Sequence, residues 1–185
     1  GLRTVVHEIA IGLGTATCAA LAPRLVKEGV CSDKLEVKLV SMDVLNDLLK
    51  RFGAHLKPDD SAACLDALIG QLSSPRGATR KRAIQCIVSL SSAMADKPLA
   101  QLVDSIVRVL GDGAAANAEL GRTYVQMLSA ILRSGGYRLG AQLELVVPIV
   151  LGHCTPATDG GAAAAAEMIE ACLHALESCV LRCSA

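Results

Sequence analysis

The sequence has few aromatic residues and no excess of charge of either sign. Its 185 residues include no Trp, two Tyr and one Phe, and 18 basic side chains balance 18 acidic ones. Nucleic-acid binding needs a basic excess that neutralises phosphates, and unpaired bases stack on aromatic side chains. We therefore expect no nucleic-acid partner. The scarcity of aromatic residues beside abundant Ala and Leu also favours helices over a β-sheet.

Long uncharged apolar runs are also missing. The longest candidate, residues 9–22, is shorter than the roughly 18 to 20 residues that a membrane-spanning helix needs, and Gly12 and Gly14 interrupt it. No secretory signal is recognisable at Gly1. We expect a cytoplasmic and nuclear chain that has no membrane partner and is cut from a longer protein.

Eight cysteines are present, but no two of them form a C-x-x-C pair. Without a secretory context, we expect free thiols that pack in the core rather than a disulfide framework. The nearest approach to a metal site is His153 with Cys154, and His174 with Cys179 and Cys183. No second ligand pair at zinc spacing accompanies them, so we expect no metal.

Motifs of catalysis and of nucleotide binding are lacking too. The sequence contains no G-x-S-x-G, H-E-x-x-H, S-x-x-K or P-loop motif, and Gly12-Leu13-Gly14 lacks the third glycine of a dinucleotide fingerprint. We expect no enzyme, no cofactor and no small-molecule substrate. An enzyme that uses Cys154, Cys179 or Cys183 is the alternative that thiol titration would test.

What the sequence does contain is a repeated helical pattern. The apolar spacing of residues 84–90 returns at residues 42–48 and 125–131, with offsets of about 41 and 42 residues. That is the period of a HEAT-type repeat, in which two antiparallel helices form one unit. In the last helix the pattern can be aligned at either Ile169 or Leu173. The sequence predicts an all-α solenoid of about four helix pairs, one right-handed superhelical segment over residues 1–185.

Turn and loop signals divide the chain into helices. Gly12 and Gly14 predict a break, which leaves the first helix as the orphan second half of a preceding repeat. Pro148 is expected to kink its helix. The helices expected are residues 2–10, 15–28, 34–51, 60–72, 76–93, 98–110, 117–134, 138–152 and 163–182.

Polar lines on the second helices are the candidate binding surface. Second helices of successive solenoid repeats line the concave side, so we expect their polar faces to be exposed in a row. That row is Asp43, Asp47, Lys50, Gln85, Ser89, Ser92, Gln126, Ser129 and Arg133. A dense basic cluster, Arg76, Arg80, Lys81 and Arg82, lies at the start of the helix that carries Gln85. It is interpreted either as a solvated helix end or as a docking site for an acidic partner. The residues predicted to bind protein are Arg76, Arg80, Lys81, Arg82, Gln85, Ser89, Gln126 and Arg133.

Several segments go beyond generic repeat patterning, and they fall in one order along the chain. They are Gly1–Val6, Leu72–Arg82, Arg122–Gln126, Gly136–Gly140, Val147–Val150 and Ala175–Cys183. Together they resemble the cullin-associated, neddylation-dissociated proteins. The chain departs from that family at residues 113–118 and 158–166, where Gly and Ala replace a more polar pattern.

This resemblance implies a non-enzymatic regulator of cullin–RING ubiquitin ligases. Family members are long HEAT solenoids that wrap an unneddylated cullin and its RING-box subunit and promote exchange of substrate-receptor modules in SCF-type ligases. The chain resembles a piece from the N-terminal part, which implies binding to the cullin C-terminal region and the RING-box subunit. The alternative is a HEAT-repeat adaptor of another pathway, either nuclear transport or a phosphatase scaffold.

Overall fold

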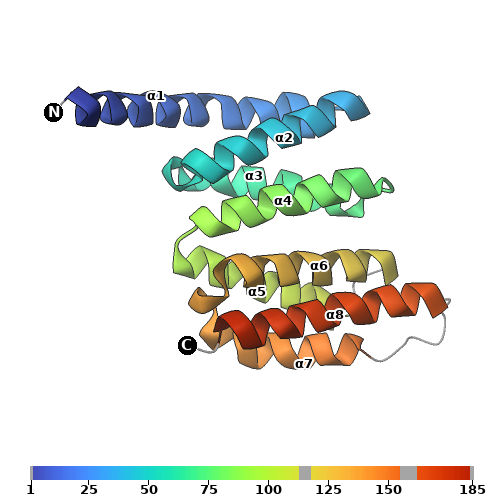
Figure 1. Ribbon diagram of the computed structural model, residues 1–185. Coiled ribbons are helices and arrows are strands. Elements are labelled where there is room, and N and C mark those ends of the chain that lie inside the picture. Colours follow the sequence, from blue (N-terminus) through green and yellow to red (C-terminus); the bar gives the residue numbers. More distant parts are fainter. Residues whose placement is uncertain (1, 113–117, 155–161, 184–185) are drawn as a thin grey trace. The chain divides into compact units, whose positions relative to one another are not determined.

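The computed structural model describes residues 2–112, 118–154 and 162–183 (Figure 1). These residues form eight α-helices and five short 3-10 or π-helical segments, with no strand among them, which confirms the predicted all-α fold. By internal contacts the chain divides into two compact units, Gly1–Ala93 and Met94–Ala185. Each unit contains two helix pairs and is described by itself. Residues 113–117 and 158–161, where the chain departs from its resemblance, lie outside the described residues.

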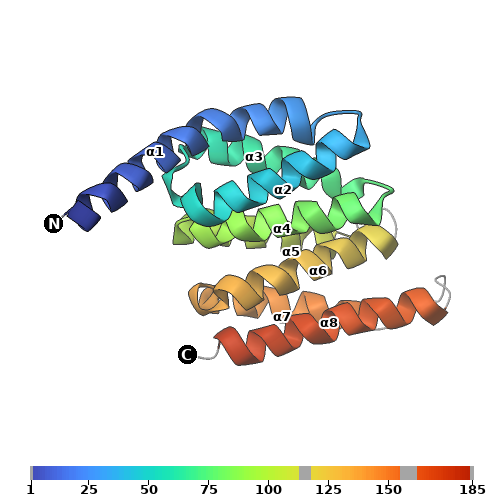
Figure 2. The ribbon, with the colours of Figure 1, turned by 45° about the horizontal axis from the view of Figure 1, so that its top comes forward.

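Unit 1 contains helices α1 (Leu2–Arg24), α2 (Leu35–Phe52), α3 (Pro58–Gly70) and α4 (Gly77–Ala93), with a π-turn at Leu25–Val30. Helix α3 begins at a proline, whose missing N–H costs no intrahelical bond in that position. The second helices of the two pairs, α2 and α4, lie side by side (Figures 1 and 2). The core between the helices includes the fully buried side chains of Met42, Leu45, Leu49, Leu68, Ile87 and Leu90.

The predicted break at Gly12 and Gly14 is wrong, because α1 runs without interruption through both residues. A Cβ atom on Gly14 would lie closer than 3.0 Å to ring atoms of Phe52, at the end of α2. The glycine therefore lets an aromatic ring approach the α1 backbone. The first helix is consequently not an orphan half-repeat, since one continuous α1 packs against α2 and α3.

Unit 2 contains helices α5 (Asp96–Gly111), α6 (Ala118–Gly135), α7 (Leu143–His153) and α8 (Ala162–Cys183). Here the second helices, α6 and α8, lie side by side (Figures 1 and 2). Helix α7 begins five residues later than predicted, because two 3-10 turns occupy Gly136–Gln142, and it continues through Pro148.

The turn before α7 is held by Arg138. Its Nε donates to Asp96 Oδ1 at 2.7 Å, and its guanidinium also donates to the Met94 carbonyl. Both contacts satisfy polar groups at the start of α5. They fix the connection between the two helix pairs of unit 2.

The buried residues of α8 distinguish between the two possible alignments of the repeat pattern, at Ile169 or at Leu173. On α4 the buried residues of the repeat pattern are Cys86, Ile87 and Leu90, and on α6 they are Met127, Leu128 and Ile131. On α8 the matching buried residues are Ala171, Cys172 and Ala175, whereas Leu173 is 59% exposed. Alignment at Ile169 is therefore correct.

The helix pairs agree with the predicted number of about four repeats. That residues 1–185 form one right-handed superhelical segment stays a prediction. No described helix is long and apolar enough to cross a membrane. The prediction of core cysteines is confirmed for five buried residues that form no disulfide, Cys18, Cys64, Cys86, Cys172 and Cys179.

Candidate protein-binding surface

The polar sides of α2 and α4 are joined across unit 1. Arg82 Nε donates to Asp43 Oδ1 at 2.8 Å. In the amide orientation that satisfies its partners, Asn46 donates to Ser89 Oγ at 2.7 Å and accepts from Lys50 Nζ at 3.1 Å. These contacts hold the two second helices in register.

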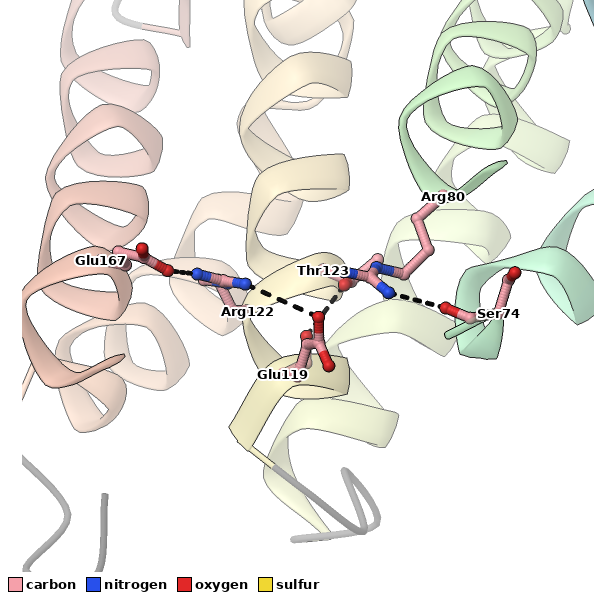
Figure 3. Close-up of polar contacts among 6 residues, drawn as sticks. All are labelled: Ser74, Arg80, Glu119, Arg122, Thr123 and Glu167. Carbon is pink, nitrogen blue, oxygen red and sulfur yellow. Dashed lines mark hydrogen bonds and ion pairs between the residues drawn. The ribbon is translucent and has the colours of Figure 1, made fainter. Parts of the chain in front are cut away.

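The predicted basic cluster divides into engaged and exposed members. Arg80 Nη1 donates to the Ser74 carbonyl oxygen at 2.6 Å, which places that guanidinium at the turn before α4 (Figure 3). Arg82 is paired with Asp43, whereas Arg76 and Lys81 are exposed. Of the cluster, Arg76 and Lys81 are therefore the cations that extend into solvent.

The expectation of a continuous exposed polar row is wrong at two positions. Ser89 is 9% exposed and Ser129 is 4% exposed, because each faces the neighbouring second helix of its own unit. Gln85, Gln126 and Arg133 are exposed as expected. That these residues bind protein stays a prediction.

A groove lies between the second helices of each unit. In unit 1 it measures about 440 Å³ and lies between the C-terminal ends of α2 and α4, where Lys50, Arg51, Ser89 and Ser92 line it. In unit 2 it measures about 590 Å³ and lies between α6 and α8. Both grooves have polar walls with small residues between them, Ala54 and Ala93 in unit 1.

The unit 2 groove is closed at one end by charged side chains. Arg122 of α6 forms an ion pair with Glu167 of α8 and lies 3.8 Å from Glu119 of its own helix (Figure 3). Thr123 Oγ1 donates to the Glu119 carbonyl oxygen at 2.8 Å. This cluster links the N-terminal turns of α6 and α8, as the Arg82–Asp43 pair links α4 to α2 in unit 1.

Four polar residues of this groove were not predicted to belong to a protein-binding surface, namely Arg122, Glu167, Glu170 and His174. Arg122 lies in the segment Arg122–Gln126 that resembles the family. Its ion-pair partner on α8 can be identified only when that helix is aligned at Ile169. The sequence left that alignment open.

The histidines and cysteines considered as metal ligands do not form a cluster in the part of the chain that the structure describes. His153 Nε2 lies 3.2 Å from the Leu110 carbonyl oxygen, and His174 lies beside Glu170 and Glu177 on the exposed side of α8. The described residues contain no group of three or more potential ligands. The side chain of Cys183 lies outside them. Burial and the neighbouring Cys154 raise the pKa of the Cys172 thiol to about 12, so it stays protonated.

Curated relatives match nearly all of the chain. Cullin-associated NEDD8-dissociated protein 1 of Arabidopsis thaliana is 33% identical over 184 residues, which cover 98% of this chain and 14% of the relative. Cullin-associated NEDD8-dissociated protein 2 of Mus musculus is 35% identical over an alignment of 189 positions, which covers 99% of this chain and 15% of the relative. The chain thus spans about one seventh of the length of the curated relatives that it matches.

Two other comparisons add nothing to this assignment. No family model matches the chain. Among solved structures, a crystal structure of an engineered protein matches at 18% identity with a TM-score of 0.47, over 86% of this chain and 37% of that chain.

The relatives carry the name of the family that the sequence motifs resemble, and they align with the chain from end to end. The chain is therefore a homologue of one segment of the cullin-associated NEDD8-dissociated proteins.

Proposed function

We propose that this chain is a non-enzymatic binding segment that contacts an unneddylated cullin and its RING-box subunit. The observation that carries the proposal is the 33–35% identity over 98–99% of the chain to relatives named for cullin association. The names of these relatives indicate a cullin as the partner. The RING-box subunit as a second partner, and the position of the chain in the N-terminal part of the parent protein, are inferred from the motif resemblance. The chain acts in the cytoplasm and the nucleus, where it tunes SCF-type ligase assembly through substrate-receptor exchange.

The two polar grooves and the exposed cations support a protein partner. Interfaces of regulatory proteins combine a polar rim with specific charge pairs, which set orientation and association rate. Arg76 and Lys81 lie at the start of α4, and Gln126 and Arg133 lie on α6, so both units contribute exposed polar groups from second helices. A protein surface with scattered acids would satisfy these groups without a deep pocket.

A direct binding measurement tests the proposal. A purified cullin–RING-box complex, with and without attached NEDD8, is immobilised and titrated with the chain and with the intact protein that carries it. We expect binding to the unneddylated complex, weakened by Arg76→Glu with Lys81→Glu and unchanged by the control Lys97→Glu on α5. Failure of both the chain and the intact protein to bind, or binding to a transport GTPase or phosphatase subunit instead, would contradict it.

A further inference from the structure

The groove between α6 and α8 has two walls of different chemistry. Helix α6 presents cations and neutral hydrogen-bonding groups, and α8 presents acids and an imidazole. The lining residues are Arg122, Gln126, Ser129, Ala130 and Arg133 from α6, and Glu167, Glu170, Ala171 and His174 from α8. Alanines between the walls leave room for a side chain of another molecule.

Ser129 is the unusual residue in this groove. It is 4% exposed, yet its Oγ has no hydrogen-bond partner. Every other described Ser or Thr of unit 2 donates to a carbonyl of its own helix, at distances of 2.7 to 3.0 Å: Ser105, Thr123, Ser134 and Ser178. Burying a hydroxyl without a partner lowers stability. Ser129 lines the groove, but its Oγ itself has less than 1 Å² of exposed surface. A serine hydroxyl moves between staggered rotamers about χ1, and a rotation toward the groove would give it the partner that it lacks.

The charged residues of the groove indicate the chemical class of a ligand that would supply this partner. Arg122 is already paired with Glu167, whereas Arg133 is exposed and makes no ion pair within the described part of the chain. Arg133 follows Ser129 by four residues, so both lie on one face of α6, one turn apart. A hydroxyl donor and a guanidinium at this spacing match the two oxygens of one carboxylate.

The opposite wall argues against a more highly charged anion. Glu167 and Glu170 line the α8 side of the groove and would repel a phosphate dianion. A single carboxylate on a protein surface carries less charge and can bring a neighbouring cation that faces Glu170.

We propose that the α6–α8 groove receives an acidic side chain of the protein partner, whose carboxylate accepts from Ser129 Oγ and from the Arg133 guanidinium. A basic side chain beside that acid faces Glu170 and His174. This inference rests on the proposed function, because the partner that supplies the acid is the cullin–RING-box pair.

Variants of the two α6 residues test the inference against the same immobilised, unneddylated cullin–RING-box complex. We expect Arg133→Glu to weaken binding about 30-fold or more, and Ser129→Ala to weaken it about fivefold, because each removes one bond to the carboxylate. Arg108→Glu, which reverses an exposed cation on α5, should stay within twofold of the unmodified chain. A second arm combines Arg133→Glu with single Asp→Lys or Glu→Lys substitutions in the partner, and one of these should restore binding.

Thermal unfolding separates a binding role of Ser129 from a structural one. Since its hydroxyl has no partner in the free chain, Ser129→Ala should leave Tm unchanged or raise it. A drop of several degrees would show a structural hydroxyl and overturn the inference. Undiminished binding by both α6 variants would overturn it as well, while leaving the proposed function intact. If the unmodified chain and the intact protein do not bind at all, the proposed function fails and this inference with it.

Discussion

The contact between Gly29 and Ser41 offers a sharp test of how unit 1 packs. Gly29 lies in the π-turn after α1, and Ser41 lies on α2. A Cβ atom at Gly29 would lie closer than 3.0 Å to both Oγ and Cβ of Ser41, whereas carbon atoms normally pack about 3.5 to 4.0 Å apart. Because the Cβ of Ser41 is fixed by the α2 backbone, no rotamer change relieves this overlap.

Gly29→Ala should therefore destabilise the chain. Overpacking of this kind costs about 1 to 3 kcal/mol, and occasionally more. The gain in helix propensity from Gly to Ala offsets at most about 1 kcal/mol. Because the overlap with Ser41 is severe, we use the upper end of that range, about 3 kcal/mol. Subtracting the propensity gain leaves a net loss of about 2 kcal/mol, measured by urea unfolding followed by circular dichroism at 222 nm. For a chain of this size that corresponds to a fall in Tm of about 4 to 8 °C.

A double-mutant cycle with Ser41 separates this clash from any other effect of the substitution. Ser41→Ala removes Oγ but leaves the Cβ overlap, so Gly29→Ala should remain costly in that background. Ser41→Gly removes both atoms, and the next atom of residue 41, its Cα, lies at 3.8 Å. Gly29→Ala should then cost almost nothing. Equal rescue by Ser41→Ala and Ser41→Gly, or no loss from Gly29→Ala alone, would refute the packing described for unit 1.

Three further measurements follow from the described contacts. Gly12→Ala should stabilise the chain by about 1 kcal/mol in urea unfolding, because nothing lies within 4 Å of the added Cβ and Gly is a poor helix former; a loss would contradict the continuous α1. Arg138→Ala should cost about 1 to 2 kcal/mol in the same assay, more than Asp96→Ala, since the Arg138 side chain is 15% exposed and that of Asp96 81%. Burial raises the pKa of the Cys64 and Cys86 thiols from 9.0 to about 12, so the unfolded chain releases protons first as pH rises. Urea midpoints should thus fall between about pH 9 and pH 12, and a C64A/C86A variant should show a shallower fall; identical profiles would contradict this linkage.

Glycine illustrates where sequence reasoning reaches its limit. In the sequence, Gly12 and Gly14 predict a helix break, yet α1 passes through both. A break and a close helix contact both require the absence of Cβ, so the residue type alone does not distinguish them. Phe52, which fills the space beside Gly14, is 38 residues away and comes near only when α2 folds back along α1.

The polar line of the second helices shows the same limit. The sequence places Ser89 and Ser129 on faces with exposed residues, and a helix wheel gives no reason to bury them. Each serine is covered by the neighbouring second helix of its unit: Ser89 on α4 by α2, and Ser129 on α6 by α8. The pairing of Arg122 with Glu167 depends on the same neighbour.

The sequence by itself determined that the chain is helical, that its helices come in pairs of about 41–42 residues, and which family its motifs resemble. The first two properties depend on local propensity and on apolar spacing along one helix, which the residue order contains directly. The resemblance depends on particular motifs and on their order along the chain. Only the tertiary structure decided which glycines allow a side chain of another helix to approach the backbone and which polar side chains are buried. It also decided that Ser129, which lines a groove, has no hydrogen-bond partner for its hydroxyl. Those outcomes depend on atoms brought together from helices far apart in sequence, and their positions follow from packing rather than from any local pattern.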